Sequence, residues 1–170
     1  MPELSTSELG DKAAAVRALL GRALEEHGPV VYANSLGAEA MVLTDIIWTH
    51  LPQIEIFSID TGRLHEETYE LLERVQRRYG RTVRMVYPDA TALERLVARQ
   101  GVNGFYRSVE QRLECCRIRK VEPFRRAISG YAAWITGVRR EQSAGRAHGR
   151  YIEWDSEYGL HKVSPLLEWN

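Results

Sequence analysis

Short apolar runs of strand type alternate with stretches of helical spacing along most of the chain, and this alternation constrains the fold most. Strand-type runs cover residues 30–33, 54–59, 82–86 and 131–136, and helical spacing covers residues 5–27, 40–50, 65–79, 90–100 and 114–128. The pattern predicts an α/β fold with a doubly wound, mainly parallel sheet and helices on both faces. Ligands bind beyond the carboxyl ends of such strands, so the loops after Ala33, Ile59 and Thr136 should share one edge.

The ends of the chain follow this pattern less clearly. Ser7 is a candidate N-cap for the first helix. After Gly137 an Arg-rich stretch at residues 139–150 predicts a mobile loop, and residues 151–163 predict one or two short edge strands. Residues 164–170 look like the start of another helix, so we do not expect a natural C-terminus there.

Size and composition restrict the classes of function. The 170 residues fit one domain. A formal net charge of zero argues against a general nucleic-acid or membrane binder. The chain lacks both an apolar run of about 20 residues and a signal-peptide pattern, so we expect a cytoplasmic protein. The two cysteines are neighbours, and their number and the expected compartment exclude a disulfide framework.

The loop after the first strand is a candidate phosphate site. It contains Ser35, Gly37, Ala38 and Glu39. Small residues let the backbone approach a phosphate, and the N-terminus of the following helix offers free N–H groups. The alternative is an ordinary strand–helix turn.

The second strand ends in Asp60, Thr61 and Gly62, and Arg63 follows. Asp and Gly at this position are typical of a turn. The functional interpretation is contact with the adenosine or phosphate edge of a nucleotide.

The adjacent cysteines Cys115 and Cys116 are the most informative feature of the sequence. Adjacent cysteines rarely bridge each other, since the closed ring is strained. Two thiolates in a reducing compartment suit a soft metal or an iron–sulfur cluster, and Arg117, Arg119 and Lys120 would favour the thiolate forms. The alternative is two small residues on a helix, one buried and one exposed.

The fourth strand is followed by a basic loop. Gly137 allows the chain to turn, and Arg139, Arg140 and Arg146 can hold phosphate or sulfate oxygens by charge-assisted bonds. A solvated basic loop is the alternative.

Several motifs in this order resemble the assimilatory sulfonucleotide reductases of the iron–sulfur type, within the PP-loop, adenine-nucleotide α-hydrolase-like superfamily. The resemblance extends from Val30 to Trp169 and implies a single nucleotide-binding reductase domain over residues 1–170. The matching stretches read S-x-G-A-E at 35–39, D-T-G at 60–62 with E-T-Y at 67–69, C-C-x-x-R-K-x-x-P at 115–123, W-x-x-G-x-R-R-x-Q-S at 134–143 and K-x-x-P-L at 162–166.

This resemblance implies thioredoxin-dependent reduction of adenosine 5'-phosphosulfate to sulfite and AMP through an S-sulfocysteine, in sulfate assimilation for cysteine biosynthesis. It implies that Cys115 and Cys116 ligate a 4Fe–4S cluster with a later C-x-x-C pair. It also implies that Lys120 supports the reaction and that Lys162 binds the substrate. Thioredoxin and a homo-oligomer are the implied partners. The family's later C-x-x-C and its nucleophilic tail cysteine do not occur in these 170 residues, so we expect an incomplete C-terminal segment.

Other functions stay open. Ala38, Glu39 and Ala40 depart from the superfamily's usual S-G-G-x-D-S loop, which suits a nucleotide with fewer phosphates than ATP. One alternative is nevertheless an ATP pyrophosphatase such as the sulfate adenylyltransferase small subunit. Another is a non-catalytic nucleotide-binding module. The 3'-phosphorylated nucleotide, phosphoadenosine phosphosulfate, is an alternative substrate.

Overall fold

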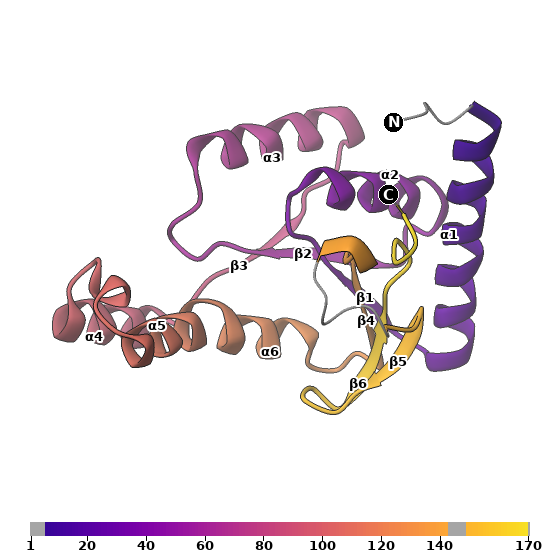
Figure 1. The fold of residues 1–170 in the computed structure, drawn as a ribbon. Helices are drawn as coiled ribbons and strands as arrows, with labels where there is room; N and C mark the ends of the chain where they lie inside the picture. The colour runs from indigo at the N-terminus through magenta and orange to yellow at the C-terminus, as the bar shows by residue number, and fades with distance from the viewer. Residues whose placement is uncertain (1–5, 143–148, 170) are drawn as a thin grey trace. The chain divides into compact units, whose positions relative to one another are not determined.

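A computed structural model describes residues 6–142 and 149–169 of the chain, and Figure 1 shows its fold. Six strands form one sheet in the order β3-β2-β1-β4-β6-β5. β1 pairs in parallel with β4, β2 with β3 and β4 with β6, whereas β5 runs antiparallel to β6. The predicted doubly wound, mainly parallel sheet is therefore confirmed.

The chain separates into two compact units, which are described one at a time. The first comprises Met1–Ile56 and Gly130–Asn170, and the second comprises Phe57–Ser129. The expectation of a single nucleotide-binding domain over residues 1–170 stays a prediction.

The first unit is built around β1 and β4, whose side chains are almost all buried. Apolar and β-branched residues such as Val31 and Ile135 suit a strand covered on both faces. α1 contacts α2, β1 and β6 (Figure 1). The elements of this unit are α1 (Thr6–His27), β1 (Val30–Ala33), α2 (Ala38–His50), the start of β2 (Glu55–Ile59), β4 (Ala133–Thr136), the short 3-10 helix η3 (Arg140–Gln142), β5 (Ile152–Asp155) and β6 (Leu160–Val163).

The second unit contains most of β2 and a set of helices whose ends carry clear local signals. The carboxylate of Asp89 caps α4 by accepting from the Ala92 N–H at 2.8 Å. Gly80 ends α3 in the left-handed conformation, at φ 63°. The elements are α3 (Glu66–Tyr79), β3 (Arg84–Val86), α4 (Ala90–Gln100), the 3-10 turn η1 (Gly104–Tyr106), α5 (Val109–Cys116), the π-helical turn η2 (Arg117–Val121) and α6 (Glu122–Ile128).

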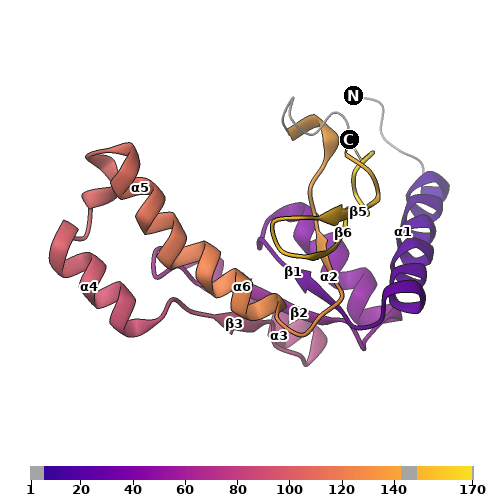
Figure 2. The ribbon, with the colours of Figure 1, turned by 90° about the horizontal axis from the view of Figure 1, so that it is seen from below.

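The helix predicted over residues 114–128 is longer and less regular than expected. α5 begins at Val109, where the Ser108 hydroxyl accepts from the Gln111 N–H at 3.2 Å. α5, η2 and α6 then continue as one helical rod (Figure 2). The π-helical turn lies directly after the two cysteines, and such turns occur frequently at functional sites.

The other predicted helices and strands are confirmed with small shifts of their ends. α2 begins at Ala38, two residues earlier than expected, and β3 is limited to Arg84–Val86. The prediction that Ser7 is an N-cap is wrong, because Ser7 already lies inside α1. Among the described residues, no helix combines the length and apolarity that crossing a membrane requires.

The C-terminal part departs most from expectation. Residues 151–163 were expected to form one or two edge strands, and they form β5 and β6. β6 lies between β4 and β5, so only β5 is an edge strand. A helix was expected from Ser164, but residues 164–169 form successive turns. The Leu167 carbonyl accepts from the Arg140 N–H at 2.8 Å, and Leu166 is fully buried. Of the expected loop at 139–150, residues 140–142 form η3 and residues 143–148 lie outside the described part.

Candidate functional site

The strand order places a reversal between β1 and β4. The chain proceeds from β1 to β2 and β3, and then resumes at β4 on the other side of β1. Ligands of parallel α/β sheets bind at such a reversal, beyond the carboxyl ends of the strands. Ala33 and Thr136, the last residues of β1 and β4, are register partners, so the loops that follow start side by side. The sequence had predicted this juxtaposition.

The loop after β1 is held in shape by Asn34, which is 4% exposed. Its Nδ2 donates to the Thr44 hydroxyl at 2.8 Å, and its Oδ1 accepts from the Leu36 N–H at 2.6 Å. Leu36 has φ 62°, an unfavourable conformation for a residue with a Cβ. Such strain often marks ligand sites. The sequence interpretation missed Asn34, although an Asn at the start of a strand-end loop is a recognisable turn signal.

The predicted phosphate loop leads directly into the N-terminus of α2. Gly37 is the N-cap residue, with φ −81° and ψ 177°. A Cβ at Gly37 would lie 3.4 Å from Glu39 Oε2 and 3.6 Å from Ser35 Oγ, so the residues of this loop are close together. The first N–H groups of a helix lack intrahelical acceptors, and the helix dipole favours an anion there. Ser35, Gly37, Ala38 and Glu39 are thus gathered at an end of a helix suited to a phosphate.

Arg139 reaches this loop from the end of β4. Its Nη2 lies 3.0 Å from Glu39 Oε1, and both side chains are about 30% exposed, at 28% for Arg139 and 31% for Glu39. The Tyr32 hydroxyl donates to the Ala40 carbonyl at 3.3 Å beneath them. Burial, and then the charge of Glu39, raises the pKa of Tyr32. The structure therefore brings one predicted anion-binding guanidinium to the phosphate loop, next to a carboxylate.

Two other predicted basic residues, Arg140 and Lys162, have carboxylate partners elsewhere in the first unit. Arg140 Nε donates to Glu168 Oε1 at 3.0 Å. Lys162 Nζ lies 2.5 Å from Glu153 Oε1, and its hydrogen bond lowers the pKa of Glu153. Arg146 lies outside the described residues. A role for Arg140, Arg146 and Lys162 in substrate binding stays a prediction.

The acidic turn after β2 belongs to the second unit and is held by several bonds. Asp60 is 6% exposed, and its N–H donates to the Val86 carbonyl at 3.0 Å. Its Oδ1 accepts from the Gly62 N–H at 2.7 Å, and its Oδ2 accepts from the Tyr69 hydroxyl at 2.9 Å. Gly62 has φ 71°, which a residue without a Cβ adopts without strain. The hydrogen bond to Asp60 raises the pKa of Tyr69.

A further contact to this turn comes from Arg119, whose Nη1 donates to the Thr61 carbonyl at 2.5 Å. The sequence interpretation had placed Arg119 with the cysteine thiolates and missed this contact. Tyr69 was present in the matching E-T-Y stretch but was not singled out as a site residue. Asp60, Thr61 and Gly62 thus form an ordered turn, and their contact with a nucleotide stays a prediction.

Cys115 and Cys116 are the last residues of α5, and both are free thiols, one half-buried and the other exposed. A 4Fe–4S cluster needs four ligands. Within the described ranges 6–142 and 149–169, three or more Cys, His, Asp or Glu residues nowhere gather as a metal site. The cysteines therefore fit half of a cluster site and not a whole one. Lys120 is exposed on the next turn, and its role in supporting the reaction stays a prediction.

Comparison with known proteins gives the relatives of this chain. The model of the phosphoadenosine phosphosulfate reductase domain matches residues 29–170. The chain is 47% identical over 169 residues to the adenosine 5'-phosphosulfate reductase of Allochromatium vinosum, covering 99% of the chain and 66% of that relative. It therefore spans less than two thirds of that relative's length.

Two solved structures resemble the fold. The phosphoadenylyl-sulfate reductase of Candida auris, in a phosphate complex, has a TM-score of 0.76 at 22% identity, covering 99% of this chain and 83% of the other. The NH3-dependent NAD synthetase of Campylobacter jejuni has a TM-score of 0.61 at 11% identity, covering 95% and 68%. The chain thus shares the α/β fold of these two structures. Within that fold class, the chain belongs to the phosphoadenosine phosphosulfate reductase domain family.

Proposed function

We propose that this chain is the nucleotide-binding part of a reductase that converts adenosine 5'-phosphosulfate into sulfite and AMP. The observation that carries the proposal is the meeting of Arg139 with the small-residue loop and the N-terminus of α2 at the strand-order reversal. The reductase would serve assimilatory sulfate reduction in the cytoplasm, leading to cysteine, and would self-associate. The names of the chain's relatives support this choice of substrate.

In the first unit, the first N–H groups of α2 would bind the phosphate of the nucleotide, and Ser35 and Gly37 would allow its close approach. Arg139 would bind phosphate or sulfate oxygens and stabilise the charge that develops as the sulfur–oxygen bond breaks. Because the Glu39 carboxylate already pairs with Arg139, it offsets part of the guanidinium's positive charge, and the pair can bind only a ligand of limited negative charge. This favours a monophosphate or phosphosulfate over a triphosphate.

The proposed reaction proceeds in two balanced steps. A cysteine thiolate attacks the sulfate sulfur, the new S–S bond forms, and the S–O bond to the phosphate breaks as AMP leaves with the electron pair. A thiolate of reduced thioredoxin then attacks the cysteine sulfur of the S-sulfocysteine and releases sulfite. The second thioredoxin thiol resolves the mixed disulfide, so the dithiol supplies both electrons. Since Cys115 and Cys116 are assigned to a metal, the nucleophile would come from outside these 170 residues.

We further propose that Cys115 and Cys116 contribute two of the four ligands of a 4Fe–4S cluster, which makes this the iron–sulfur type of reductase. When bound, the cluster would supply an electrostatic field and would carry no electrons in the step. Lys120, exposed on the following turn, would add positive charge to that field.

The test is an anaerobic assay of the protein as the cell makes it, with reduced thioredoxin and each of three nucleotides. The proposal predicts sulfite and AMP from adenosine 5'-phosphosulfate, less from the 3'-phosphorylated nucleotide, and a trapped protein adduct that carries one SO₃ group. Arg139→Gln should lose most turnover, whereas the control Arg77→Gln, at an exposed ion pair on α3, should keep it. Pyrophosphate release from ATP would indicate a pyrophosphatase instead, and nucleotide binding without sulfite would indicate a non-catalytic module.

A further inference from the structure

Arg119 is a buried cation in the second unit that the proposed reaction does not use. It is 9% exposed, although Arg residues seldom lose this much contact with water unless a partner compensates their charge. In the part of the chain that the structure describes, its Nε is buried without a hydrogen-bond partner. Burying this side chain is therefore costly, and its position calls for a reason beyond packing.

The contact that Arg119 does make is specific. Its Nη1 donates to the Thr61 carbonyl at 2.5 Å, 58 residues away in the sequence. A Cβ on Gly62 would lie only 3.3 Å from the same Nη1, so the guanidinium packs closely against the backbone of the turn. Arg119 thus holds the turn from one side, while the Asp60 carboxylate holds it from within through the Gly62 N–H.

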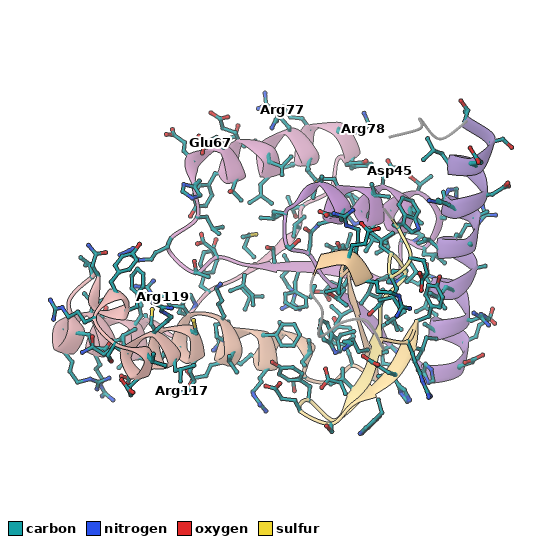
Figure 3. All side chains as sticks on the ribbon, viewed as in Figure 1. Asp45, Glu67, Arg77, Arg78, Arg117 and Arg119 are labelled. Atoms are coloured by element: carbon teal, nitrogen blue, oxygen red, sulfur yellow. The ribbon has the colours of Figure 1, made fainter. Side chains whose placement is uncertain are left out.

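The neighbouring arginine shows that this placement is not a general property of the helical rod. Arg117 lies two residues earlier, is exposed and pairs with Glu122. In Figure 3, Arg117 and Arg119 lie on opposite sides of the helical rod. The π-helical turn η2 contains both residues, so a change of helical period occurs where Arg119 is directed to the turn.

We infer that Arg119 is a positioning residue that fixes the turn at residues 60–62 in the conformation that binds the nucleotide. This inference rests on the proposed function, because it assumes that the turn takes part in nucleotide binding. Arg119 also links the cysteines to the turn, because it follows Cys116 by three positions and donates a hydrogen bond to the Thr61 carbonyl. Arg119 therefore acts through the backbone of the turn, and the bound nucleotide need not touch it.

The test compares Arg119→Lys with Arg117→Lys in the whole natural protein. Lysine keeps the charge but lacks the planar, forked donor that reaches Thr61. We expect Arg119→Lys to weaken AMP binding about tenfold, the factor that one lost charge-assisted bond typically produces. We also expect faster hydrogen exchange at the Gly62 amide in this variant. Arg117→Lys should change neither quantity.

Two outcomes separate the inference from the function on which it rests. If the wild-type protein binds AMP and Arg119→Lys binds it equally well, the inference is wrong while the function stands. If the wild-type protein binds neither AMP nor adenosine 5'-phosphosulfate, both are wrong. Should Arg119→Lys fail to fold, Gly62→Ala provides the test, because it strains the turn against an intact guanidinium. That variant should show the same weakening of AMP binding, and unchanged affinity would overturn the inference.

Discussion

Replacing Asn34 by Ala tests how the loop after β1 is held. The substitution removes two hydrogen bonds, from Nδ2 to Thr44 and from the Leu36 N–H to Oδ1, at 2.8 and 2.6 Å. At about 1 kcal/mol per bond, the free energy of unfolding should fall by about 2 kcal/mol. For a protein of this size that corresponds to a drop of about 4–8 °C in Tm. Because Leu36 loses the bond that supports its φ of 62°, the loop should relax and AMP binding should weaken as well.

The assay is urea unfolding together with calorimetric titration of AMP, on Asn34→Ala and on the control Asn103→Ala. Asn103 is exposed and bonds Arg63 at 2.9 Å, so its loss should change stability by less than about 0.5 kcal/mol. The reasoning is refuted if Asn34→Ala costs no more stability than the control. It is also refuted if Asn34→Ala loses stability while AMP affinity stays unchanged.

Three further predictions follow from single residues. Leu36→Val should lower stability by about 1 kcal/mol or more while Leu36→Asn is tolerated in thermal unfolding, because Asn accepts positive φ more readily than a β-branched residue; equal losses would contradict this. Glu39→Gln should tighten AMP binding several-fold at low salt and less at high salt, because it releases Arg139 from its ion pair; weaker binding would contradict this. The hydrogen bond to Asp60 raises the pKa of Tyr69, so this bond should stabilise the fold below pH 10, and the stabilisation should be lost as the pH rises through the folded-state pKa. Unfolding curves measured across this pH range should show the loss in the wild-type protein and not in Tyr69→Phe.

The sequence predicted the strands, most of the helices and the position of Arg139, because these features depend on hydrophobic periodicity and on where the strands end. Period-2 and period-3.6 patterns indicated the strands and most helices, since each reflects which face of an element is buried. The carboxyl-edge rule then placed Arg139 near the loop at residues 35–39, as the structure has it. The α5 start was also within reach, because Ser108 and Gln111 have the spacing of a capping box, which the prediction overlooked.

The features that the sequence did not predict depend mostly on contacts between residues that are distant in the sequence. Arg119 bonds Thr61 across 58 residues, and local spacing on its helix associated it with the cysteines instead. Residues 164–169 carry a pattern that favours a helix start, but the bond from the Arg140 N–H to the Leu167 carbonyl and the burial of Leu166 favour turns. Tertiary contacts thus override local propensity there. The local strain at Leu36 likewise has no sequence signal of its own.

The most direct test of the central claim is calorimetric titration of the natural protein and of Arg139→Gln with AMP, adenosine 5'-phosphosulfate and ATP. We expect AMP and the phosphosulfate to bind more tightly than ATP, and Arg139→Gln to bind both about tenfold or more weakly, because a charge-assisted bond at the N-terminus of α2 is lost. Tighter binding of ATP, or unchanged affinities in Arg139→Gln, would contradict the assignment of this edge of the sheet to a sulfonucleotide.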